Sequence, residues 1–183
     1  MSNPIVQAAS ERARFGCKGS NAPAWLSSLG LDVPSCINEW RQSPDGHLVA
    51  QLGLSEFLVE AFASQQTAQR IARQISEPSQ RQSGLIAVPR QDHVLDISGS
   101  HSTELLAQIC NVDFRPHART ATETTGSVIL TMMMGVATTV VPRQAAGGLV
   151  FTLWIDPSFA TYFNENLMKI IHDIYRDTAD GTI

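Results

Sequence analysis

Two segments of the chain, 18–29 and 98–109, carry the same pattern of glycine, small polar and apolar positions. Each follows a strand-like run and contains a glycine, Gly19 or Gly99, which we expect to form a turn that other residues rarely adopt. Apolar residues then recur at helical spacing, so each segment is predicted to form a short amphipathic helix. These residues are Trp25, Leu26 and Leu29 in the first segment and Leu105, Leu106 and Ile109 in the second. The repetition predicts a fold of two related halves.

Small polar residues stand at the start of both predicted helices. Ser20 and Asn21 in the first copy, and Ser100 and Ser102 in the second, are of types that cap helices by accepting hydrogen bonds from first-turn amides. We therefore expect a side-chain cap on each helix. Pro23 suits the first turn of a helix, where its missing N–H costs nothing.

The rest of the chain predicts strands, hairpins and two further helices. In the first half, strands at 47–52 and 56–60 flank a turn at 53–55, and an amphipathic helix at 64–76 stops before Pro78. After a polar linker at 77–83, the second half has strands at 84–88, 93–97, 128–133, 136–141 and 149–155, and a long helix opened by Asp156 and Pro157. The expected fold class is α+β, with antiparallel sheets and helices packed on one side. The halves span about 15–76 and 84–176 of a single domain, 1–183.

Composition narrows the class of protein further. With 183 residues of which 43% are hydrophobic, the chain is long enough for one domain with a substantial core. A net charge of −4 without an extended Lys/Arg cluster disfavours a nucleic-acid or membrane-surface partner. No signal-like segment and no apolar run of about eighteen residues is present, so we expect a cytoplasmic protein. Three widely spaced cysteines, Cys17, Cys36 and Cys110, suggest reduced and mostly buried thiols.

Few residues are arranged for chemistry. The glycine-rich patterns of nucleotide-binding loops are missing, and five scattered histidines offer no metal-ligand spacing. Cys110 ends a predicted helix, where the helix dipole disfavours a thiolate, so we expect a structural thiol. The run 132–134 of three methionines is expected to fill the core, with a pocket or an interface as the alternative. Asp113 either faces a ligand cleft or forms a local turn with Arg115.

These residues also resemble a known family. The string 15–34 (FGCKGSNAPAWLSSLGLDVP), followed by Asn38-Glu-Trp40, Asp45-Gly46 and 52–58, resembles the gamma subunit of heterotetrameric sarcosine oxidase. In the second half the resemblance continues through 95–99 (LDISG), 105–116 (LLAQICNVDFRP) and 156–162 (DPSFATY). This family is similar to the folate-binding T protein of the glycine cleavage system and shares part of its fold. The resemblance extends over nearly the whole chain.

The resemblance implies a supporting role in an enzyme complex. The chain would be a non-catalytic subunit beside alpha, beta and delta subunits, in a complex that demethylates sarcosine or a related N-methyl amino acid. FAD, FMN, NAD and tetrahydrofolate would belong to the complex, with none of them bound by this chain. Asp113 lies at the position that resembles an aspartate near the folate in the T protein, which makes it the one candidate cofactor-binding residue. The alternative is a free-standing folate-dependent aminomethyl- or methyltransferase, but the segment that grips the pterin in such enzymes is missing here.

Overall fold

The computed structural model describes residues 4–61, 73 and 83–175, whose strands form two antiparallel sheets. The first sheet consists, in spatial order, of β6 (Ile86–Val88), β2 (Arg14–Lys18), β5 (Glu56–Ala61), β4 (His47–Gln51), β3 (Glu39–Gln42) and β8 (Thr125–Ser127). The second sheet consists of β1 (Ile5–Ala8), β7 (His93–Ser98), β11 (Gly148–Ile155), β10 (Val136–Ala145) and β9 (Ile129–Met133). The α+β class with antiparallel sheets is confirmed.

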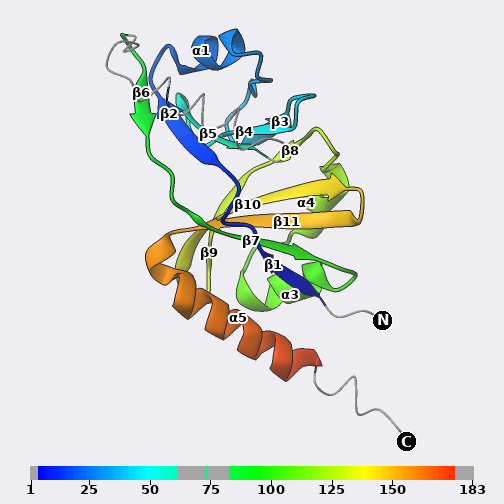
Figure 1. The fold of residues 1–183 in the computed structure, drawn as a ribbon. Helices are drawn as coiled ribbons and strands as arrows, with labels where there is room; N and C mark the ends of the chain where they lie inside the picture. The colour runs from blue at the N-terminus through cyan, green and yellow to red at the C-terminus, as the bar shows by residue number, and fades with distance from the viewer. Residues whose placement is uncertain (1–3, 62–72, 74–82, 176–183) are drawn as a thin grey trace, which may run out of the picture.

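The helices lie on the outer faces of the two sheets. Figure 1 shows α1 (Ala22–Ser28) outside the first sheet, and α3 (Ser102–Ile109) and α5 (Ala160–Tyr175) outside the second. A short helix, α4 (Arg115–Thr120), follows α3, and a 3₁₀ turn, η2 (Pro157–Phe159), leads into α5. Each sheet therefore has helices on one side, as expected, and turns its other side toward the second sheet. Among the described helices, none is long and apolar enough to cross a membrane.

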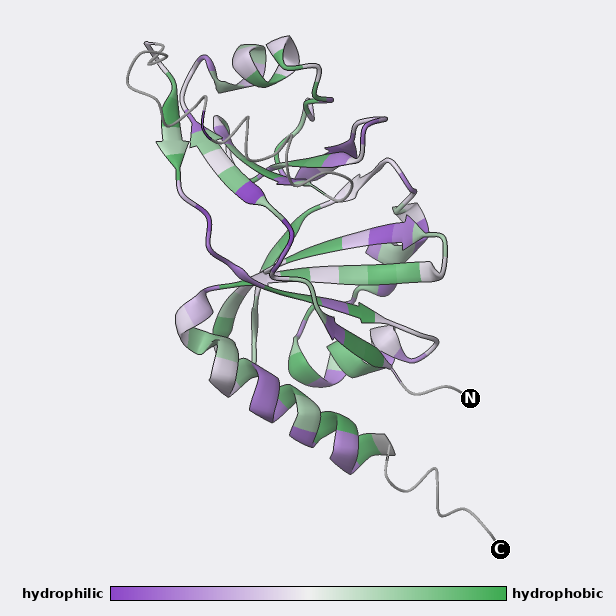
Figure 2. Ribbon diagram, viewed as in Figure 1, coloured by the Kyte–Doolittle hydropathy of each residue, from purple (hydrophilic) through white to green (hydrophobic). Residues whose placement is uncertain are grey.

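Three apolar clusters fill the spaces between these layers, and Figure 2 shows the green apolar segments running through the inner strands. One cluster joins α1 to the first sheet and includes Trp25, Leu26 and Phe57. A second joins α3 and α5 to the second sheet and includes Leu105, Phe151 and Phe163. The third lies between the sheets. Its members are Ala9, Trp40, Leu48, Ala50, Leu58, Val94, Val128, Val141 and Trp154.

The strands do not stay within the predicted halves. β1 precedes the first half yet pairs with β7 of the second sheet, while β6 and β8, which belong to the second half by sequence, pair with β2 and β3. A sheet edge is completed by whichever strand lies beside it, so these three strands pair outside the two predicted halves. The boundaries of the halves stay a prediction. The order β2-β5-β4-β3 in one sheet has the same connectivity as β7-β11-β10-β9 in the other. That the halves superpose stays a prediction.

The two glycine turns form as expected, but the predicted side-chain caps do not. Gly19 and Gly99 have φ angles of 125° and 100°. The N-cap residues Asn21 and His101 make no side-chain capping bond. Instead, the carbonyl oxygens of the glycines accept hydrogen bonds from the N–H groups of Ala22 and Ser102 at 3.1 and 3.2 Å. The sharp turn thus supplies a backbone acceptor at the start of each helix.

Most other elements agree with the sequence. The turn at 53–55 joins β4 to β5, and the Asp156 carboxylate accepts the Ser158 N–H at 2.8 Å at the start of η2. The predicted helix at 64–76 and most of the linker at 77–83 lie outside the described residues. β1, β3, β8 and α4 were not predicted, because each is short and lacks a clear apolar period.

Candidate functional site

Asp113, the candidate cofactor-binding residue, lies in the loop between α3 and α4. Its carboxylate accepts hydrogen bonds from Nε and Nη2 of Arg115 at 2.8 and 3.0 Å, and from the Arg115 backbone N–H at 3.0 Å. About half of its side-chain surface remains exposed. Of the two sequence interpretations, the local turn with Arg115 therefore describes the geometry. Whether this residue also contacts a cofactor stays a hypothesis.

Electrostatics at Asp113 favour the ionised form. Hydrogen bonds from Arg115 hold the pKa of the Asp113 carboxyl below its ordinary value. A general acid or base that works near neutral pH usually has a carboxyl pKa shifted upward instead. The arrangement is therefore suited to binding a donor or fixing a turn, and unsuited to proton transfer.

A cavity of about 390 Å³ opens beside this loop. Its lining includes Glu104 and Ala107 of α3, Asn111 and Asp113 of the loop, and Arg115 at the start of α4. Phe114 forms the buried base of the loop, with its ring edge-on to Phe151 at 5.7 Å between centroids. Asp113 and Arg115 thus both line this cavity, where they are already paired with each other.

Cys110 lies at the C-terminal end of α3 and also lines this cavity. Its sulfur contacts Oγ1 of Thr131 at 3.3 Å and the backbone nitrogen of Val112 at 3.4 Å. Because it is buried and sits at the negative end of the helix dipole, these contacts agree with a structural thiol. Cys17 is buried as well, and burial raises the pKa of its thiol to about 12, whereas Cys36 is exposed.

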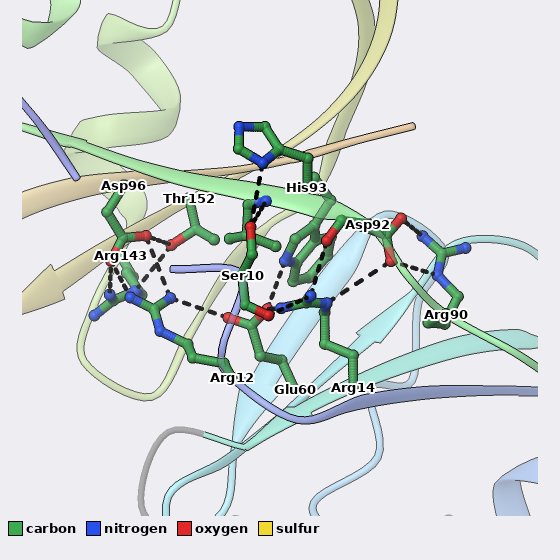
Figure 3. Close-up of polar contacts among 12 residues, drawn as sticks. Ser10, Arg12, Arg14, Glu60, Arg90, Asp92, His93, Asp96, Arg143 and Thr152 are labelled. Carbon is green, nitrogen blue, oxygen red and sulfur yellow. Dashed lines mark hydrogen bonds and ion pairs between the residues drawn. The ribbon is translucent and has the colours of Figure 1, made fainter. Parts of the chain in front are cut away.

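The largest group of interacting charges lies elsewhere, between the two sheets (Figure 3). Arg12, in the link from β1 to β2, donates to Glu60 of β5 at 3.1 Å and to both carboxylate oxygens of Asp96 of β7. Asp96 also accepts from Thr152 at 2.6 Å and from Arg143 at 3.2 Å. The Asp96 carboxylate is therefore bonded to three other segments of the chain: the β1–β2 link, β10 and β11.

Glu60 is the most enclosed member of this network. Its side chain is completely buried and accepts from Trp154 Nε1 at 2.8 Å and from Arg14 at 3.4 Å, in addition to Arg12. Burial raises the pKa of the Glu60 carboxyl above its ordinary value, and the charges of Arg12 and Arg14 oppose that rise. Three donors aimed at one carboxylate stabilise its ionised form in this setting.

The network continues toward the surface through Asp92. Its carboxylate binds Arg90 with two hydrogen bonds, at 2.7 and 3.0 Å, and its carbonyl accepts from Arg14. A second buried interaction joins the two sheets nearby: Trp40 Nε1 of β3 donates a hydrogen bond to the carbonyl oxygen of Pro142 in β10, at 3.1 Å. These groups join the two sheets in one relative position.

Sequence reasoning did not find this network. Its contacts to Glu60 and Asp96 join residues that are far apart in the sequence. The only available signal is that Glu60 and Asp96 stand inside apolar runs, where a charge requires a partner. Elsewhere in the described part of the chain, no group of three or more His, Cys, Asp or Glu side chains is placed to hold a metal ion.

The three methionines at 132–134 lie in different environments. Met133 is buried in the cluster beneath the second sheet, as expected, whereas Met132 is exposed and Met134 adopts a positive φ of 49° in the β9–β10 turn. The prediction of core filling is therefore wrong for Met132, because successive side chains of a strand point to opposite faces.

Comparison with solved structures identifies proteins of the same fold. The chain is similar to a chain of the heterotetrameric sarcosine oxidase from Corynebacterium sp. U-96, determined in complex with pyrrole 2-carboxylate, with a TM-score of 0.71 and 18% identity over 93% of this chain and 84% of that one. It is also similar to the glycine cleavage system aminomethyltransferase T from Bartonella henselae, with a TM-score of 0.59 and 15% identity over 91% of this chain and 46% of that one. The sequence matches neither a protein-family model nor a curated protein.

These similarities establish the fold. The suspected relation to heterotetrameric sarcosine oxidase and to the T protein is confirmed at the level of structure. The chain shares its fold with part of the aminomethyltransferase T, and its other neighbour is a chain of an oxidase assembly. At these identities, a shared fold does not specify an activity.

Proposed function

We propose that this chain is a small, non-catalytic, gamma-type subunit of a cytoplasmic, flavin-dependent oxidase or dehydrogenase complex that demethylates sarcosine or a related N-methyl amino acid. Its partners are alpha-, beta- and delta-type subunits, which hold the FAD, FMN, NAD and tetrahydrofolate. In this role the chain contributes a folded surface for assembly, and the reaction takes place on the larger subunits.

The coverage of the two structural matches carries the proposal. The aligned region takes in 84% of the chain from the sarcosine oxidase, so the two folded regions are close in size. It takes in only 46% of the aminomethyltransferase. The TM-score is also higher for the sarcosine oxidase chain, at 0.71 against 0.59. The fuller match to the oxidase chain supports a subunit of such an assembly over a transferase.

The state of Asp113 also supports a non-catalytic role. Its carboxylate is already bound by the side chain and the backbone of Arg115. A site for a ring ligand such as folate needs several convergent polar groups around one pocket. Here Asp113 and Arg115 are already paired with each other, and Glu104 is the other charged residue of the lining.

Co-purification tests this proposal. When the chain is expressed together with beta- and alpha-type subunits from the same genome, we expect a single complex that contains all the chains and oxidises an N-methyl amino acid. Omitting this chain should reduce the yield of assembled complex while the flavin remains on the beta-type subunit. A complex that assembles and turns over equally well without the chain would contradict the proposal.

Replacing Asp113 tests the absence of a folate role. We expect Asp113→Ala to leave the turnover and the formaldehyde capture of the reconstituted complex unchanged, because the lost pair with Arg115 is exposed and local. Arg115→Ala, which removes the same pair from the other side, is the matched control. Titration calorimetry of the isolated chain with tetrahydrofolate should show no micromolar binding. Micromolar binding that Asp113→Ala abolishes, or a fall in formaldehyde capture of roughly a hundredfold, would favour the transferase alternative.

A further inference from the structure

One corner of the second sheet is left uncovered on the face that elsewhere packs against the first sheet. Leu130 of β9 pairs with Thr139 of β10, which pairs with Trp154 of β11, so these three side chains share one face. Trp154 is buried between the sheets, but Leu130 is 54% exposed. Met132, two residues further along β9, lies on the same face and is 55% exposed. The apolar layer between the sheets thus continues beyond the edge of the first sheet.

This corner forms the floor of a groove of about 360 Å³. Leu130, Ala137 and Thr139 line it from the sheet, and the segments 89–92 and 156–157 form its walls. β9 is the last strand of the sheet and carries neither a charge nor a proline. Edge strands exposed to water are commonly protected by such residues. The walls carry polar and charged residues, and the exposed apolar side chain of Leu130 lies on the floor. Exposed apolar residues with a polar rim, beside an unprotected edge, are typical of a surface that another chain covers.

The charges at the groove indicate the chemistry of that chain. Arg90 and Asp92 neutralise each other through two hydrogen bonds. Asp156 is exposed, and its carboxylate accepts only from Ser158 among the described bonds, which lowers its pKa and keeps it ionised. The rim is therefore negative, and the whole chain carries a net charge of −4. A second copy would bring like charges together, whereas a partner with a cationic residue would be attracted.

We infer that the groove over Leu130, together with the exposed Met132 on the same face, is the docking site for a larger subunit of the proposed complex, which inserts an apolar side chain flanked by a lysine or arginine. The inference rests on the proposed function and assigns its interface to one face of the molecule. The apolar anchor continues the layer between the sheets, and the cationic neighbour pairs with Asp156. Trp154, which is buried, lies at the inner side of the groove.

The test measures binding of this chain to the remaining subunits, purified as a complex without it. Leu130→Lys should weaken binding by at least about tenfold, the loss expected for a central interface residue. The matched control is Leu54→Lys in the β4–β5 turn, where the side chain is 86% exposed, and it should bind within about twofold of the unmodified chain. Asp156→Asn, which keeps a capping oxygen, should weaken binding and reduce its dependence on salt. Urea unfolding of each variant verifies that it folds. If Leu130→Lys does not fold, Leu130→Ala replaces it in the binding measurement.

The possible outcomes separate the inference from the proposed function. If the unmodified chain and Leu130→Lys bind equally well, the groove is not the docking site, although the subunit role stands. If the unmodified chain does not bind the remaining subunits at all, the subunit role and the docking site both fail. If sedimentation shows that the isolated chain dimerises and that Leu130→Lys separates the dimer, the occupant is a second copy and the inference is overturned.

Discussion

Glu60→Ala should lower the free energy of unfolding by about 3 kcal/mol or more, since breaking a buried ion pair leaves its partners without compensation. Arg12 and Arg14 would each lose one of their carboxylate partners, and Trp154 Nε1 would lose its acceptor between the sheets. Glu60→Gln keeps an oxygen for Trp154 and should cost less. Urea unfolding followed by tryptophan fluorescence measures the change, because Trp154 and Trp40 both lie in this layer.

Arg41→Ala is the control for this prediction. Arg41 pairs with Glu39 at 3.1 Å, but its side chain is 45% exposed. Exposed pairs of this kind contribute about 1 kcal/mol or less. If Glu60→Ala were no more destabilising than Arg41→Ala, the buried network would not be what holds the two sheets together.

Gly19→Ala should destabilise the fold by about 3 kcal/mol or more, through strain and overpacking together. Gly19 has a φ of 125°, and a Cβ atom there would lie 2.2 Å from the carbonyl oxygen of Gly84. The obstacle is backbone, held in place by the hydrogen bond from the Asn21 N–H to the same oxygen at 3.0 Å. Thermal unfolding with circular dichroism measures the loss.

Gly135→Ala separates the strain of the positive φ from the overpacking against Gly84. Gly135 also has a positive φ, of 81°, but a Cβ atom there would meet nothing within 4 Å. Only the cost of the left-handed conformation applies, which is about 1–2 kcal/mol. Equal losses for Gly19→Ala and Gly135→Ala would mean that the contact with Gly84 does not restrict this turn.

The elements with strong local signals could be predicted from sequence. α5 and the hairpin at 53–55 follow from apolar spacing, turn residues and a capping aspartate that act within a few positions of one another. The turns at Gly19 and Gly99 follow from a conformation that only glycine adopts easily. The local pair of Asp113 with Arg115 was also accessible, since the two residues are near neighbours in the chain.

Tertiary structure alone decided which strands complete each sheet and how the sheets face each other. β1 and β6 find their places through pairing with β7 and β2, and no local pattern specifies an edge partner. The exposure of Met132 beside the buried Met133 likewise depends on how far the first sheet extends over the second. Sequence by itself determined the two glycine turns, the main helices and hairpins and the α+β class, because these depend on neighbouring residues. The network around Glu60 and the groove over Leu130 required the tertiary structure, because burial and ion pairing arise only when distant segments meet.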